Sequence, residues 1–235
     1  MPAFYWTTDA EEAKKEQLAL RDLVTLNTTL LRSLDFKRGI AIGTAYDENT
    51  KRSFAVGVSF NGVGAYSSET IKENIEVDFP YVPGLLAFRV GPPICVILDK
   101  VADQFDLLLF DGQGIAHRDG FGLASHIGVL YNKPAIGMTR HNLYGRFTDP
   151  PRGRFNSTEV LHPQTGAPIG YSVSFGEQCD PCYISPGHHI ALKDALTIVC
   201  RIAGDTSCFP RCLQRAHAIA NSTAKSFWRN QSSGI

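Results

Sequence analysis

One stretch decides the fold: Asp106–Leu107–Leu108–Leu109–Phe110–Asp111–Gly112–Gln113–Gly114–Ile115–Ala116–His117. The apolar run 107–110 is typical of a strand inside a parallel sheet, and Asp111 ends it. Ligands of such sheets bind beyond the carboxyl ends of the strands, and carboxylates suit hard divalent cations. The glycines after Asp111 let a ligand approach the backbone closely. Two interpretations stay open, a metal ligand at the rim of the sheet or a strand, a turn and a solvated Asp.

The segments on either side extend this strand into a mixed sheet. Gly122–Leu130 has the character of a helix and Ala135–Met138 that of a short buried strand, which predicts a parallel β-α-β unit. Upstream, Gly39–Tyr46 and Ser53–Phe60 are joined by a polar turn, as in a hairpin. A third antiparallel strand lies within Ala65–Phe79. We therefore predict a single α/β domain over residues 1–235, with antiparallel strands first, parallel strands second and helices on both faces.

The remaining elements follow from helical spacing, caps and turn residues. Asp9 caps a helix predicted to run to Leu31, and prolines at the first turn start another over Pro93–Ala102. The Pro- and Gly-rich stretch Thr148–Pro168 is predicted to be a long loop. Short strands are predicted at Tyr171–Phe175 and Tyr183–Ser185, and two last helices at Ala191–Ala203 and Phe209–Trp228.

Composition excludes a bulk electrostatic reason to bind nucleic acid. The chain has 23 basic and 23 acidic residues, so contact with a polyanion needs a local basic patch. Candidate patches, which are equally consistent with solvated loops, contain Arg140, His141, Arg146, Arg152 and Arg154. No apolar run reaches about 18 residues, so we predict no membrane span. The polar segment 1–16 lacks a signal core, and we expect a cytoplasmic protein, or a nuclear one in a eukaryote.

Six cysteines leave a choice between a metal site and free thiols. Cys179 and Cys182 are spaced C-x-x-C, and Cys208 and Cys212 C-x-x-x-C, so the four together offer a zinc site. Against this, Cys182 begins an apolar run typical of a buried strand. We expect reduced thiols in a reducing compartment rather than structural zinc.

Several segments resemble signatures of the endonuclease V family. They are FPYVPGLLAFR (79–89), FDGQGIAH (110–117), FGLASH (121–126) and YISPGH (183–188), and the likeness continues to RAH (215–217). The resemblance implies an RNase H-like fold and a role with deaminated nucleic acid. Members of the family cut a phosphodiester near inosine with a divalent metal, usually magnesium, with manganese as a substitute. A monomer is expected.

The resemblance also implies a set of substrate-binding residues. The family's Pro-Tyr-x-Pro wedge, which fills the space left by the altered base, matches Pro80, Tyr81 and Pro83. A flipped base must be held in a close pocket. The positions that match this pocket, where small residues let backbone amides read the base edge, are Gly84, Leu86, Gly112, Gly122 and Gly137. Turn glycines and a core leucine would give the same pattern without any ligand.

Two positions depart from the family pattern where its chemistry needs carboxylates. The family's first strand carries an Asp where this chain has Gly43, or Thr44 if the register slips by one, and Val90 replaces a Glu after Phe-Arg. Asp111 is then the one metal ligand left of three, which predicts a weak or absent magnesium site. The acidic residues that remain as substitutes are Asp47, Glu69 and Asp78.

The resemblance makes Asp111, His117, His188 and Arg140 the catalytic candidates. His188 matches an active-site histidine and His117 one near the scissile phosphate, while Arg140 replaces a lysine and Gln113 a His or Asn. The histidines either move protons or contact phosphate, or they are hydrogen-bonded remnants of the cleft.

Three functions follow, and we favour the first. The protein recognises inosine-containing DNA or RNA with impaired or absent cleavage; it is an active metal-dependent endonuclease; or it is a scaffold that kept only the fold.

Overall fold

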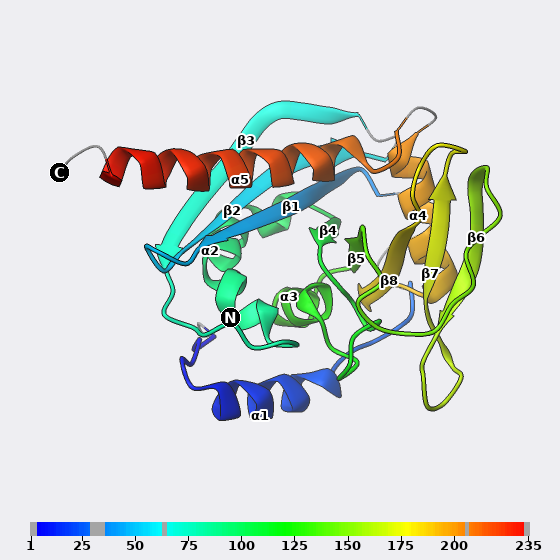
Figure 1. The fold of residues 1–235 in the computed structure, drawn as a ribbon, viewed down its shortest axis with the longest axis horizontal. Coiled ribbons are helices and arrows are strands. Elements are labelled where there is room, and N and C mark those ends of the chain that lie inside the picture. Colours follow the sequence, from blue (N-terminus) through cyan, green and yellow to red (C-terminus); the bar gives the residue numbers. More distant parts are fainter. Residues whose placement is uncertain (1–3, 29–35, 63–64, 205–206, 233–235) are drawn as a thin grey trace.

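The computed structural model describes residues 4–28, 36–62, 65–204 and 207–232. These residues form one eight-stranded sheet in the order β3-β2-β1-β4-β5-β8-β7-β6 (Figure 1). The strands are β1 (Arg38–Asp47), β2 (Arg52–Asn61), β3 (Tyr66–Glu76), β4 (Leu107–Asp111), β5 (Ala135–Thr139), β6 (Arg154–Leu161), β7 (Pro168–Phe175) and β8 (Cys182–His188).

The sheet is mixed, as predicted. Strands β1, β2 and β3 pair antiparallel, β4 pairs parallel with both β1 and β5, and β8, β7 and β6 continue antiparallel. Strand β4 lies in the middle, where its four apolar residues are fully buried. The arrangement is RNase H-like, with helices on both faces of the sheet.

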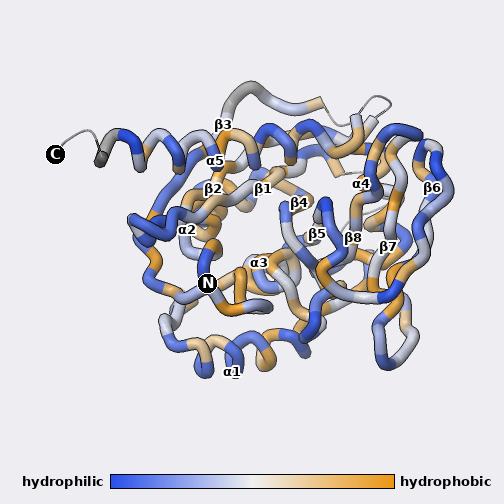
Figure 2. The backbone as a smooth tube through the Cα atoms, viewed as in Figure 1, coloured by the Kyte–Doolittle hydropathy of each residue, from blue (hydrophilic) through white to orange (hydrophobic). Residues whose placement is uncertain are grey.

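Alternating side chains of β4 separate the two faces. Leu108 and Phe110 pack against α2 (Leu86–Val101) and α3 (Leu123–Tyr131), while Leu107 and Leu109 pack against α4 (Leu192–Ala203) and α5 (Arg211–Ser232). A short 3₁₀ helix, Ala102–Gln104, follows α2. Helix α1 (Ala10–Arg21) lies outside α3 and is mostly hydrophilic in Figure 2. The sheet thus presents Asp111 at the carboxyl end of its central strand.

The first helix ends earlier than predicted. Helix α1 ends at Arg21, and residues 22–28 leave the helix. The N–H of Thr25 donates to Nδ1 of His188 (3.2 Å), and the N–H of His189 donates to the carbonyl of Thr25 (2.6 Å). Because these bonds join the segment to the end of β8, tertiary contacts outweigh its helical spacing. Residues 29–31 of the predicted helix lie outside the described residues.

Helix α2 begins at Leu86, seven residues before the predicted start, so Pro92 and Pro93 lie inside it. Proline is costly there because it removes an N–H and crowds the preceding turn. Burial of an apolar face outweighs that cost: Phe88, Val90 and Ile94 are each at most 2% exposed. Two further differences concern strands. Residues 154–161 of the predicted loop form the edge strand β6, and β7 and β8 are longer than predicted.

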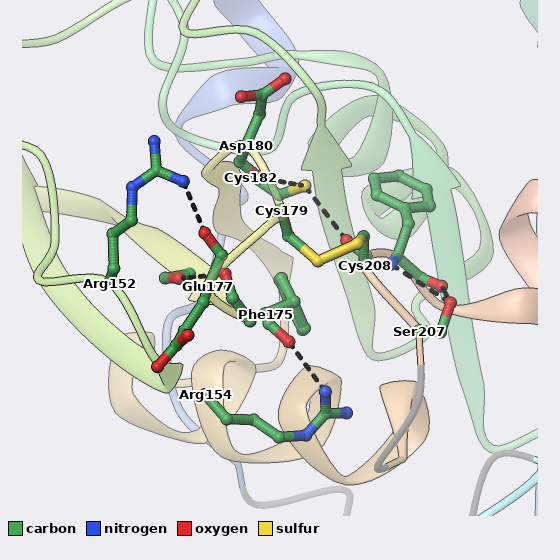
Figure 3. The surroundings of a disulfide bond; sticks show 12 residues. Arg152, Arg154, Phe175, Glu177, Cys179, Asp180, Cys182, Ser207 and Cys208 are labelled. Atoms are coloured by element: carbon green, nitrogen blue, oxygen red, sulfur yellow. Dashed lines mark hydrogen bonds between the residues drawn. A yellow bond between two sulfur atoms is a disulfide. The ribbon is translucent and has the colours of Figure 1, made fainter.

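The expectation of reduced thiols is wrong for two of the cysteines. Cys179 and Cys208 form a disulfide that joins the β7–β8 loop to the segment before α5 (Figure 3). Cys182 and Cys212, the other members of the considered zinc site, are free and buried. Spacing missed the pair because it spans 29 residues. No helix in the described part of the chain is long and apolar enough to cross a membrane.

Candidate nucleic-acid site

Asp111 is paired with a histidine from the far end of the chain. Nδ1 of His217, on α5, lies 2.7 Å from Oδ2 of Asp111, and their side chains are 45% and 21% exposed. The hydrogen bond to Asp111 raises the pKa of His217, while burial and the positive charge of Arg140 act in the opposite direction. The hydrogen bond therefore favours the protonated imidazole of His217 and occupies one oxygen of Asp111.

Gly43 lies beside Asp111 because its neighbour Ile42 pairs with Phe110 across β1 and β4. The backbone of α5 rests directly on this glycine. A Cβ atom at position 43 would lie 2.3 Å from the backbone nitrogen of His217 and 2.5 Å from the carbonyl carbon of Ala216. A carboxylate at this position would therefore require α5 to move. The close helix also explains how His217 reaches Asp111.

The described residues do not offer the donors of a magnesium site. Val90 is 2% exposed in the apolar core beneath α2, and Asp47 accepts hydrogen bonds from N–H groups of its own turn. Asp47 follows Gly43 by four strand positions, about 13 Å. Asp78 is paired with Lys51 at 2.7 Å. The side chain of Glu69 is outside the described part. No group of three His, Cys, Asp or Glu side chains gathers within the described ranges.

A cavity of about 160 Å³ lies beside this centre, and we call it the Tyr81 pocket. It brings together seven of the eight predicted substrate-binding residues. Its walls are formed by Gln17, Pro80, Tyr81, Val82, Pro83, Gly84, Leu85, Leu86, Ala87, Arg89, Gly112, Gln113, His117, Phe121, Gly122, Leu123 and Leu143. Tyr81, Leu86 and Leu143 are 72%, 43% and 65% exposed, so the mouth of the pocket is apolar.

Two buried side chains hold the loop 80–84, which carries the wedge residues, in place. The amide nitrogen of Gln17 donates to the carbonyls of Gly84 (2.7 Å) and Phe121 (3.0 Å). His117 accepts from the N–H of Asp119 at Nδ1 (3.1 Å) and makes a second hydrogen bond to the backbone of Gly84. Burial lowers the pKa of His117 to about 4. A neutral His117 with both ring nitrogens engaged is suited to holding the two loops together.

The other predicted residues lie outside the pocket. Gly137 is on β5, where a Cβ atom would lie 2.4 Å from the carbonyl oxygen of Gly112. The missing side chain therefore lets the loop 112–114 pack closely against β5. Arg140 follows β5, with its guanidinium 4.2 Å from the centroid of the Phe209 ring. His188 is 4% exposed at the end of β8, where it accepts from Thr25. Burial lowers the pKa of His188 to about 4.

The family model that matches this chain is that of endonuclease V, over residues 18–218. The chain belongs to the endonuclease V family. Endonuclease V of Thermus thermophilus is 36% identical over 190 residues, which are 80% of this chain and 84% of that protein. Endonuclease V of Xanthomonas campestris is 35% identical over 181 residues, 77% of this chain and 72% of that protein.

Solved structures agree with this membership. Endonuclease V from Streptomyces avermitilis superposes with a TM-score of 0.80 at 28% identity, over 94% of this chain and 95% of that one. Endonuclease V from Ciona intestinalis was solved in complex with a 24mer DNA containing an inosine followed by a ribo-adenosine. It superposes with a TM-score of 0.77 at 18% identity, over 92% of this chain and 98% of that one. At that identity the likeness concerns the fold alone.

The sequence alone assigns no role to His217 or Gln17, which the structure brings to this candidate site. His217 was part of the quoted likeness at 215–217, but nothing in the sequence places it against a carboxylate 106 positions earlier. Gln17 lies on a polar helix, and its 1% exposure and its two hydrogen bonds, which the sequence does not show, distinguish it from a solvated residue.

Proposed function

We propose that this endonuclease V family member recognises inosine-containing nucleic acid by accepting the flipped base into the Tyr81 pocket, and that it does not cut the strand efficiently. The observation that carries the proposal is the gathering of the wedge and the small pocket residues around one cavity. A cavity of about 150 Å³ can hold a benzene-sized ring, so the size suits the edge of a base. Base flipping needs such a close pocket.

Two features of the pocket suit its proposed role. The ring of Tyr81 is 72% exposed, so it is available to stack where the base has left the duplex. Gly112 and Gly122 also line the cavity, where their backbone forms part of the wall against which a flat ring can pack. The pocket thus combines an exposed stacking surface with a close cavity beside it, which suits a flipped base.

The cleavage centre is the weaker half of the site. The family is generally metal-dependent, and metal ions in such reactions stabilise the attacking and leaving oxygens. Here Asp111 is hydrogen-bonded to His217, and α5 closes the place of the missing Asp at Gly43. Because these residues do not fit a magnesium ion, we derive no metal-dependent step. Losing one preorganised stabilising group costs about 100-fold or more in rate, and this chain lacks two.

Binding to strands that differ in one base tests the recognition. We would measure the shift of single-stranded and duplex DNA and RNA carrying one inosine, against strands with guanosine at that position. The proposal predicts tighter binding to inosine, and loss of this preference in Tyr81→Ala. Tyr66→Ala, which changes an exposed tyrosine on β3, is the matched control and should keep the preference.

Each remaining outcome selects another function. Equal, salt-sensitive binding to both strands indicates a general contact with phosphate and contradicts the proposal. No binding to any strand indicates a scaffold. Nicking near the inosine in magnesium or manganese, abolished by Asp111→Ala, indicates an active endonuclease.

A further inference from the structure

A buried guanidinium forms part of the wall of the Tyr81 pocket. Arg89 is 6% exposed, and its guanidinium carbon lies 3.7 Å from the centroid of the Tyr46 ring and 5.6 Å from that of Tyr81. Its Nε has no hydrogen-bond partner among the described residues. A buried cation with an unused donor is unfavourable unless an anion accompanies it. Arg89 is therefore suited to an anion that enters the pocket.

In the free protein, the anion next to Arg89 is the carboxylate of Glu48, whose side chain is largely exposed to solvent. Oε2 of Glu48 lies 2.5 Å from Nη2 of Arg89, and the Glu48 side chain is 71% exposed. Solvated carboxylates bind weakly, because water competes for them and their side chains lose freedom on pairing. Glu48 reaches Nη2 and leaves Nε without a partner. The contact satisfies Arg89 only in part.

The position of Glu48 next to the wedge is fixed by the turn that carries it. Lys51, in the same turn, is paired with Asp78 at 2.7 Å, and its carbonyl accepts from the N–H of Val77 at 2.7 Å. The hydroxyl of Tyr46 donates to the carbonyl of Val77 at 2.8 Å. The turn is thus tied to the strand end that leads into Pro80 and Tyr81. Because the Glu48 side chain is 71% exposed, solvent can take the place of its contact with Arg89.

We propose that Arg89 binds a phosphate of the nucleic acid beside the flipped base, and that Glu48 occupies Arg89 in the free protein as a competitor that the phosphate displaces. Two oxygens of one phosphodiester can accept from Nη2 and Nε together, which a guanidinium favours. Glu48 then acts as an internal brake on binding. The inference rests on the proposed function, because it places the phosphate at the same pocket.

Two charge-matched variants test the brake. Glu48→Gln removes the competing charge, and Glu76→Gln removes an equal charge from a glutamate that is 70% exposed and lies 4.0 Å from Arg52. We would measure the dissociation constants of both variants by anisotropy with fluorescent 12-nucleotide strands. Glu48→Gln should tighten binding by about threefold to fivefold, the range expected of a weak ion pair, and Glu76→Gln by less than about twofold. Both the inosine and the guanosine strand should gain, because Arg89 contacts phosphate.

A double variant assigns the effect to Arg89. In the Arg89→Gln background, Glu48→Gln should give no tightening, because the group that it releases is absent. Arg89→Lys should bind more weakly than the wild type although it keeps the charge, because lysine lacks the guanidinium fork. Melting curves confirm that each variant is folded. If Arg89→Gln does not fold, the comparison of Glu48→Gln with Glu76→Gln decides alone.

A titration with inorganic pyrophosphate separates this inference from the proposed function. Pyrophosphate should raise the melting temperature of Glu48→Gln more than that of Glu76→Gln. If Glu48→Gln and Glu76→Gln bind the strands equally well and gain equally in melting temperature with pyrophosphate, Glu48 does not compete for Arg89, even if inosine remains preferred. A brake that is confirmed without any inosine preference would leave Arg89 as an anion site and reject the proposed function.

Discussion

The contact between α5 and Gly43 predicts a large effect from a single methyl group. In Gly43→Ala the new Cβ would lie 2.3 Å from the backbone nitrogen of His217, about 1 Å short of the 3.4 Å at which ordinary contact begins. The neighbouring atoms are helix backbone, so they cannot rotate away. Overpacking of this kind costs about 1–3 kcal/mol. For a chain of this length, each kcal/mol lowers Tm by about 2–4 °C, so a cost of roughly 2 kcal/mol gives a drop of about 4–8 °C.

Thermal melting followed by circular dichroism measures this drop, with Gly176→Ala as the control. A Cβ at Gly176 would meet only the sulfur of Cys179 at 3.4 Å, so the control should melt with the wild type. Movement of α5 should also separate His217 from Asp111, which a shift of the His217 imidazole resonances would report. A Gly43→Ala variant as stable as the wild type would refute the reasoning, because it would show that α5 does not close the space beside Asp111.

Three further predictions concern buried groups. Burial lowers the pKa of His117 from 6.5 to about 4 and that of His126 to about 3. Because the unfolded chain therefore binds protons at a higher pH than the folded one, the urea concentration at the unfolding midpoint should decrease as the pH is lowered from about 6.5 to 4. Equal midpoints at about pH 7 and pH 5 would contradict this. Gln17→Ala leaves two carbonyls without their donor and should lower the free energy of unfolding by about 1–3 kcal/mol, as urea denaturation measures, while Lys15→Ala should not. Reduction of the Cys179–Cys208 disulfide should lower it by about 3–4 kcal/mol, and the same reductant should leave Cys208→Ala unchanged.

The sequence predicts the centre of the fold because local patterns and burial agree there. The apolar run 107–110, the hairpin of β1 and β2 and the short strand β5 are all found where expected. The elements that differ are those in which a distant partner decides. The segment after Arg21 pairs with the end of β8, and α2 tolerates two prolines because its apolar face is buried. A single sequence does not show such partners.

The site divides in the same way. The family resemblance implies the wedge and pocket residues from short contiguous segments, and seven of these residues line one cavity, while their role in binding stays a prediction. The roles of His217, Gln17 and Glu48 depend on contacts between segments far apart in the chain, so no spacing rule finds them. The absence of carboxylates at Gly43 and Val90 was visible in the sequence. That α5 fills the place of the first one required the structure.

The central claim is that the pocket persists beside a centre that no longer holds the metal for cleavage. A single-turnover experiment tests it most directly, with protein in excess over a labelled inosine strand, in magnesium and separately in manganese, after binding has been confirmed in the same tube. We predict that the bound strand stays intact over hours. Nicking near the inosine by the wild type, lost in Asp111→Ala, would contradict the account.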